Sequence, residues 1–222
     1  MKVRYVAEAT FASKMLAFLL VCRQDVGVPI VNDATPKGWT HRGYLPHFDG
    51  GSVTQFITCR LADSLPQKIL ERWRMELKAR PIENIDREVL FLIEKFLDKG
   101  YGECYLKQPE IAEIIKSSLL KFDGERYKLL AWVIMPNHIH LLLRPINDWS
   151  LSKILHSFKS FTASETNKVL GREGRFWMRE YFDRYIRDAE HFEKAFRYIE
   201  NNPVKAGLCE KPSEWKYSSA FK

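Results

Sequence analysis

The sequence has few cysteines and no long apolar run. Its cysteines are widely separated and form no C-x-x-C pair: Cys22, Cys59, Cys104 and Cys209. This spacing excludes a zinc-ribbon pattern and is not typical of a small disulfide scaffold. No stretch approaches the roughly 18 to 20 consecutive apolar residues that a membrane span needs. We therefore expect a cytoplasmic protein with no membrane partner.

The composition is that of a folded protein with a basic surface. The chain has 222 residues, of which 45% are hydrophobic, and six of them are tryptophan. This is enough apolar side chain for a real core and argues against general disorder. The 35 Lys and Arg outnumber the 28 Asp and Glu by seven. A basic balance favours an acidic partner such as nucleic acid, although +7 alone is a weak signal.

The first 37 residues differ from the rest of the chain. A short apolar run over 15–21 is followed by the turn-forming sequence N-D-A-T-P-K-G over 32–38. One interpretation is a secretory signal, but Glu8 and Lys14 interrupt it and Val21 is a poor cleavage position. We interpret 1–37 as a poorly ordered leader and 38–222 as a single domain.

The remaining patterns predict an α+β fold. Strands are expected at 53–61, 127–135 and 138–144, with 176–187 partly extended, and helices at 66–77, 89–97, 109–120, 151–170 and 189–201. Pro203 should end the last helix, because it cannot donate a backbone hydrogen bond. This order favours a ferredoxin-like or RRM-like βαββαβ core: an antiparallel sheet with helices packed on it, and residues 81–100 inserted in the first crossover.

Two histidines share one face of a predicted strand. Side chains alternate along a strand, so His138 and His140 point the same way while Ile139 points to the other face. Two neutral imidazoles side by side can chelate a divalent cation, but a stable site needs further ligands. A histidine pair on a half-solvated face would give the same pattern.

The last predicted helix offers a phenol and an amide beside its buried face. Phe192, Phe196 and Ile199 follow helical spacing and form the apolar stripe. Tyr198 and Asn202 are one turn apart on its flank, so both can dock on the histidine face of the sheet. A half-buried tyrosine with a structural hydroxyl is the competing interpretation.

Together these residues supply a possible metal site and a possible nucleophile. A metal ion held by His138, His140 and the Asn202 oxygen can polarise a phosphodiester, and Tyr198 can then attack phosphorus and form a covalent ester. A tyrosine has a pKa near 10, so this attack needs a group that takes its proton. The sequence does not identify that group, and His191 is a weak candidate.

Two motifs carry a resemblance to a known family. M-P-N-H-I-H over 135–140 and Y-I-E-N-N-P-V over 198–204 resemble the REP-associated tyrosine transposases. This family is part of the HUH superfamily of single-strand transposases, which includes the IS200-like enzymes. Supporting segments lie at 44–50, 176–177, 183–188 and 215–219, so the resemblance extends over about 43–220. The leader matches nothing in the family.

The resemblance implies an HUH transposase fold and a specific chemistry. It implies cleavage and rejoining of single-stranded DNA at REP-type hairpins, with Mg²⁺ or Mn²⁺ as the cofactor. By this similarity His138, His140 and Asn202 are the metal ligands and Tyr198 is the nucleophile, which holds the 5′ phosphate and releases a 3′ hydroxyl. The family includes single-copy, domesticated proteins. The chain could act as a monomer or a homodimer.

Basic residues near the predicted sheet are candidates for DNA contact. The stretch 150–180 is net basic and ends near an aromatic pair, and Arg144 shares the strand face of the histidines. The predicted contacts are Arg144, Lys153, Lys159, Arg175, Trp177 and Arg179, although a solvated helix and a core tryptophan would look the same. The alternatives to a transposase are a non-catalytic nucleic-acid-binding protein and a phosphodiesterase that uses water.

Overall fold

The computed structural model describes residues 38–41, 46–79 and 85–222. All of them belong to one unit of the chain, which runs from Pro36 to Lys222. The predicted leader lies outside the described residues, and its disorder stays a prediction. Within the described part, no helix is both long and apolar enough to cross a membrane.

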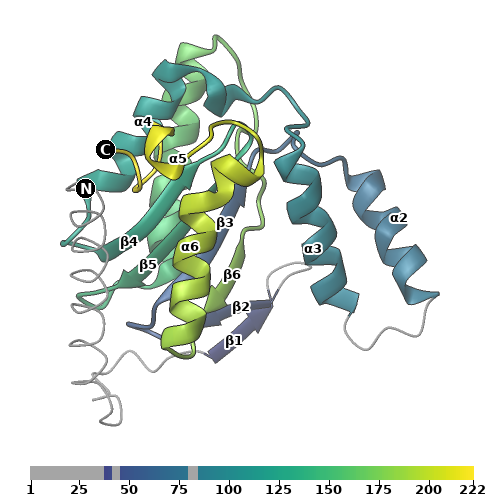
Figure 1. Cartoon of the computed structure of the whole chain (residues 1–222), viewed down its shortest axis with the longest axis horizontal. Coiled ribbons are helices and arrows are strands. Elements are labelled where there is room, and N and C mark those ends of the chain that lie inside the picture. Colours follow the sequence, from purple (N-terminus) through teal and green to yellow (C-terminus); the bar gives the residue numbers. More distant parts are fainter. Residues whose placement is uncertain (1–37, 42–45, 80–84) are drawn as a thin grey trace, which may run out of the picture. The chain divides into compact units, whose positions relative to one another are not determined.

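A four-stranded antiparallel sheet forms the centre of the protein (Figure 1). Its strands are β3 (Gln55–Arg60), β4 (Tyr127–Ile134), β5 (His138–Pro145) and β6 (Phe182–Tyr185), in the order β4-β5-β3-β6. All three neighbouring pairs are antiparallel. This is the strand order of a ferredoxin-like βαββαβ core, so the predicted fold class is confirmed.

Helices fill the crossovers and cover the sheet. They are α2 (Gln67–Lys78), α3 (Ile85–Asp98), α4 (Pro109–Lys121), α5 (Leu151–Val169) and α6 (Ala189–Lys205), with short 3-10 turns η1 (Tyr105–Lys107) and η2 (Pro212–Glu214). A separate hairpin, β1 (Gly38–His41) and β2 (Pro46–Asp49), lies beside β6. Helix α3 lies within the predicted insertion 81–100, and it packs against α2 around Leu70, Val89 and Leu97.

The two faces of the sheet have different roles. Ile57, Ile139 and Leu141 point to one face and join apolar residues of α4 and α5 in the main core. The opposite face carries Thr58 and His140, which are directly paired across β3 and β5. Helix α6 covers this second face, with contacts to β4 and β5 (Figure 1). The alternation predicted for the H-x-H strand is therefore confirmed.

Helix α6 begins as predicted but ends later. The side chain of Asp188 accepts a hydrogen bond from the backbone N–H of His191, at 2.7 Å, as expected of an N-cap. Pro203 was expected to end the helix, and this is wrong: the helix continues to Lys205 with Pro203 buried inside it. Backbone bonds from Ala206 to the Asn202 carbonyl and from Leu208 to the Pro203 carbonyl keep the last turn closed despite the missing N–H. Asn202 consequently stays helical.

A buried histidine fastens β2 to β6. The His47 Nδ1 lies 2.5 Å from an Asp183 oxygen, and its Nε2 lies 3.3 Å from a Glu180 oxygen. Burial lowers the pKa of His47, but hydrogen bonds and charge interactions with Asp183 and Glu180 outweigh this effect and leave the pKa raised. The imidazolium form therefore stabilises the native state.

This network predicts a pH-dependent stability difference. Replacing His47 by glutamine leaves two buried carboxylates without their cation and should cost about 3 kcal/mol of unfolding free energy near pH 6. Because the folded pKa is raised, the stabilisation is complete below the ordinary pKa and is lost as pH rises through the folded value. Urea unfolding of both proteins at several pH values measures this difference, and a difference that does not shrink at high pH would contradict the assignment.

Candidate active site

The imidazole rings of His138 and His140 face each other through their Nε2 atoms. The Nε2 atoms of His138 and His140 are 3.1 Å apart. On the other side of each ring, His138 Nδ1 lies 2.7 Å from the Asn137 side-chain oxygen and His140 Nδ1 lies 2.9 Å from the Thr58 hydroxyl. Because the amide oxygen of Asn137 can only accept, His138 carries its proton on Nδ1, and its Nε2 presents a lone pair towards His140.

Both imidazoles are buried and uncharged. Burial, together with the nearby charge of Lys205, lowers the pKa of His138 to about 3. Burial also lowers the pKa of His140, with smaller contributions from His138 and Lys205. Neutral imidazoles keep the lone pairs that a metal ion requires. The 3.1 Å spacing of the two Nε2 atoms would let both imidazoles bind one divalent cation.

Helix α6 brings Tyr198 against this pair. The ring of Tyr198 contacts the edge of His140, with centroids 5.3 Å apart, and lies 5.8 Å from the ring of Phe56. Its hydroxyl oxygen is buried without a well-formed hydrogen bond to any described residue, although Asn202 and Glu94 lie beside it. Burial raises the pKa of Tyr198, and the negative charges of Glu94 and Asp98 raise it further.

Asn202 lies one turn further on the same face of α6. It is fully buried, and both its side-chain oxygen and nitrogen lack hydrogen-bond partners in the described structure. Lys205 lies about two turns after Tyr198, with its Nζ 5.3 Å from the centre of the Tyr198 ring, and its charge lowers the pKa of both histidines. A buried amide oxygen with no partner is costly unless it receives a ligand, and it fits a metal ion beside two imidazoles.

No group of three His, Cys, Asp or Glu that could hold a metal ion occurs among the described residues. Amide oxygens also bind divalent cations, so Asn202 can complement the two imidazoles. The Asn202 oxygen is of the right type and is placed on the right face. The residues present thus fit a divalent cation.

The structure adds acidic residues that the sequence analysis missed. Glu94 on α3 adjoins the Tyr198 hydroxyl, and one turn later Asp98 forms an ion pair of 2.7 Å with Lys205 of α6. Nothing in the local pattern of 81–100 indicates this docking. His191, the weak candidate for proton removal, lies seven residues before Tyr198, which is about 10 Å along the helix.

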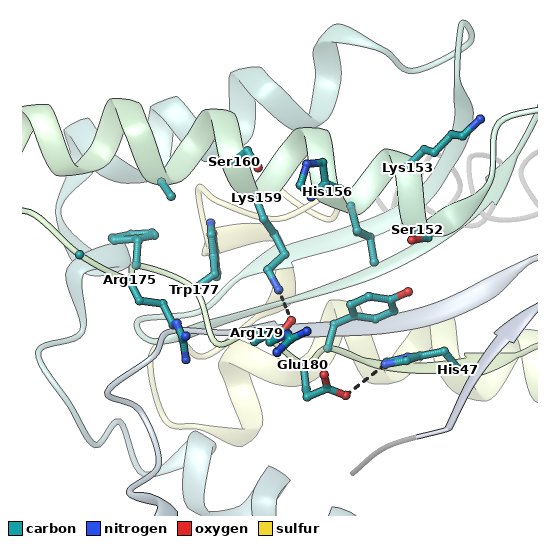
Figure 2. Close-up of a pocket in the computed structure, with 15 residues that line it drawn as sticks. His47, Ser152, Lys153, His156, Lys159, Ser160, Arg175, Trp177, Arg179 and Glu180 are labelled. Carbon is teal, nitrogen blue, oxygen red and sulfur yellow. Dashed lines mark hydrogen bonds and ion pairs between the residues drawn. The ribbon is translucent and has the colours of Figure 1, made fainter. Parts of the chain in front are cut away.

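Most of the predicted DNA contacts gather at a cavity on the α5 side of the sheet (Figure 2). Lys153 and Lys159 come from α5, and Arg175 and Arg179 from the segment before β6. Arg144 is not among them: it lies on the histidine face of β5 but six residues beyond His138, about 20 Å along the strand.

Trp177 also lines this cavity, but its predicted role in base stacking is wrong. Only 3% of the residue is exposed, and its indole N–H donates to the Thr162 hydroxyl at 2.9 Å. The ring packs against Phe158 and Phe176 in the main core. A tryptophan held in this way is structural, as the competing interpretation has it.

The comparisons with known proteins identify the central segment. Residues 105–202, which contain both motifs, match the family model described as "Transposase IS200 like". This stretch is therefore similar to the IS200-like transposases. The predicted resemblance to the REP-associated tyrosine transposases is confirmed by two curated relatives.

The first, "Putative REP-associated tyrosine transposase" of Haemophilus influenzae, is 33% identical over 103 residues, which is 42% of this chain and 58% of the relative. The second, "REP-associated tyrosine transposase" of Escherichia coli, is 24% identical over 110 residues, which is 48% of this chain and 63% of the relative. The chain thus spans less than two thirds of either curated relative. A solved REP-associated tyrosine transposase bound to a REP hairpin aligns over 81% of each chain with 18% identity and a TM-score of 0.48.

Proposed function

We propose that this protein cleaves and rejoins single-stranded DNA at REP-type hairpins through a covalent phosphotyrosine intermediate. The observation that carries the proposal is the placement of Tyr198 and Asn202 on one face of α6, against the His138 and His140 pair. The IS200-like family match and the names of the curated relatives support the transposase class and the REP-type substrate.

His138, His140 and Asn202 would hold Mg²⁺ or Mn²⁺. These residues would place the ion beside the scissile phosphodiester, where a bound divalent cation would supply Lewis-acid polarisation. Hydrogen bonds to the Nδ1 atoms orient the two imidazoles: Asn137 binds that of His138, and Thr58 binds that of His140. Burial keeps both rings neutral at physiological pH.

The covalent step exchanges one phosphate ester for another. The Tyr198 oxygen attacks phosphorus, the new Tyr–O–P bond forms, and the bond from phosphorus to the 3′ oxygen breaks. The tyrosine proton passes to the Glu94 carboxylate, and the departing 3′ oxygen takes a proton from solvent water. Glu94 then returns its proton to solvent, so the net proton count is unchanged. The 5′ end stays on the protein. A later attack by a 3′ hydroxyl reverses the step and rejoins a strand.

The test is incubation with a labelled single-stranded REP-type hairpin and Mn²⁺, followed by denaturing electrophoresis. A labelled band at protein mobility indicates the phosphotyrosine adduct that we expect. Cut DNA without an adduct would instead indicate water as the nucleophile. Intact DNA that shifts only in a native gel would indicate a binding protein without cleavage.

Replacing Glu94 by glutamine tests its role in proton transfer. The change keeps the shape of the side chain but removes its ability to accept a proton. We expect adduct formation to slow about a hundredfold, a typical contribution of general-base catalysis. Single-turnover rates at saturating DNA measure this effect, and Glu88→Gln on the same helix is the isosteric control. If Glu94→Gln forms the adduct at an unchanged or faster rate, Glu94 does not accept the tyrosine proton, and its negative charge only opposes ionisation of Tyr198.

A further inference from the structure

A cationic cavity lies on the opposite side of the sheet from Tyr198. We call it the α5 groove, and its volume is about 550 Å³. One wall is a face of α5 that carries Lys153, His156 and Lys159, and the other is the segment 174–181 (Figure 2). Helix α5 packs on the Ile139 face of β5, whereas the histidine pair faces α6, so the groove is separate from the candidate active site.

Three of the four cations of the groove are available to a ligand. The Lys159 ammonium is already bound: it donates to the carbonyls of Met178 and Arg179, at 2.6 and 2.8 Å. In contrast, Lys153, Arg175 and Arg179 are exposed, and none has a carboxylate partner among the described residues.

The one acidic side chain of the groove does not neutralise these cations. Glu180 is buried, and its carboxylate pairs with the imidazole of His47, which also lines the groove (Figure 2). Lys159 also ties the wall of the groove to α5 through the two carbonyls, so the cations of both walls are held around one cavity. A cavity of this size with three unpaired cations suits an anionic ligand with several phosphates.

The backbone connects this groove to the histidine pair. The N–H of Met178 donates to the carbonyl of Arg60 at 2.8 Å, and Arg60 is paired with His138 across β3 and β5. Two strand spacings separate Met178 from His138, a distance of about 10 Å. Because the segment 174–181 continues the β6 edge of the sheet, DNA bound at the histidines can enter the groove by passing round that edge.

We propose that the α5 groove binds the phosphate backbone of the DNA next to the cleavage site, through Lys153, Arg175 and Arg179. The proposal rests on the proposed function for the identity of the substrate. The groove holds DNA in place and takes no part in the bond exchange at Tyr198. Its contacts are to phosphates, so they contribute affinity without reading a base sequence.

The experiment measures binding without cleavage. In a Tyr198→Phe background with EDTA present, the triple variant K153A/R175A/R179A is compared with the charge-matched control K68A/R72A/K78A on α2. Fluorescence anisotropy with a REP-type hairpin that carries single-stranded tails gives Kd from 0.05 to 0.2 M salt. We expect the triple variant to bind about thirtyfold more weakly at 0.2 M, and the slope of log K against log salt to fall by about two.

The control variant should stay within about threefold of its parent, because its cations lie outside the groove. Equal losses in both variants would overturn the proposal, since general charge attraction would then explain the effect. The triple variant could instead lose binding of dTTP, which the control keeps, while its hairpin affinity stays unchanged. This result would assign the groove to free nucleotides and would also overturn the proposal.

DNA cleavage at Tyr198 and DNA binding in the α5 groove are contradicted by different results. If wild-type protein forms the covalent adduct but the triple variant binds the hairpin normally, the groove proposal fails and the proposed function stands. If the adduct never forms but the triple variant binds DNA thirtyfold more weakly than the control, the proposed cleavage fails and the DNA-binding groove stands.

Discussion

Replacement of Tyr198 by phenylalanine should eliminate the covalent protein–DNA adduct. The substitution removes one oxygen and keeps the ring that packs on His140 and Phe56. Without that oxygen no phosphotyrosine can form, so the adduct should fall below detection, a loss of at least about a thousandfold. The hydroxyl makes no well-formed hydrogen bond, so the unfolding free energy should change by less than about 1 kcal/mol.

The controls are the tyrosines nearest in sequence, Tyr181 and Tyr185. Tyr181→Phe and Tyr185→Phe should form the adduct at close to the wild-type rate, because neither residue lies on α6. Gel quantification of the adduct, with a thermal melt and a binding curve for each variant, measures all three effects. An adduct that persists in Tyr198→Phe and disappears in one of the controls would refute the assignment of the nucleophile.

Loss of the metal site should also abolish cleavage. We expect no adduct from wild-type protein in excess EDTA and full recovery on addition of Mn²⁺, because the phosphodiester is then polarised again. His140→Ala should reduce adduct formation at least about a thousandfold in saturating Mn²⁺. Hairpin affinity should stay within about threefold, since it rests on Lys and Arg contacts to phosphate.

Burial adds a stability cost to His140→Ala. The imidazole is fully buried, and its removal leaves the Thr58 hydroxyl unpaired, so we expect a loss of about 2 kcal/mol. A thermal melt shows whether the variant is folded at the assay temperature, and the EDTA series needs no substitution. Full cleavage in EDTA, or by a folded His140→Ala protein, would contradict a metal-dependent mechanism.

Local patterns predicted the parts of the site that local geometry controls. Alternation along a strand placed His138 and His140 on one face, and helical spacing placed Tyr198 one turn before Asn202. Ser150 and Asp188 are residue types that favour helix N-termini, and both side chains accept backbone hydrogen bonds there. Such features depend on neighbouring residues alone.

The remaining features depend on packing between distant segments. Glu94 reaches Tyr198 only because α3 docks on α6, where Asp98 pairs with Lys205 across 107 positions. Trp177 is buried because its backbone forms a β-bridge with Leu61 and its indole N–H donates a hydrogen bond to the Thr162 hydroxyl. Pro203 stays helical because the carbonyls of Asn202 and Pro203 accept hydrogen bonds from the backbone N–H groups of Ala206 and Leu208. No periodic pattern in the sequence encodes these contacts.

The location of the covalent bond tests the central claim most directly. Wild-type protein is incubated with the hairpin and Mn²⁺, the trapped adduct is digested with nuclease and protease, and the modified peptide is sequenced by mass spectrometry. We predict a nucleotide 5′ phosphate on the oxygen of Tyr198 and a free 3′ hydroxyl on the released DNA. A phosphate on any other residue, or cut DNA with no modified peptide, would contradict the account.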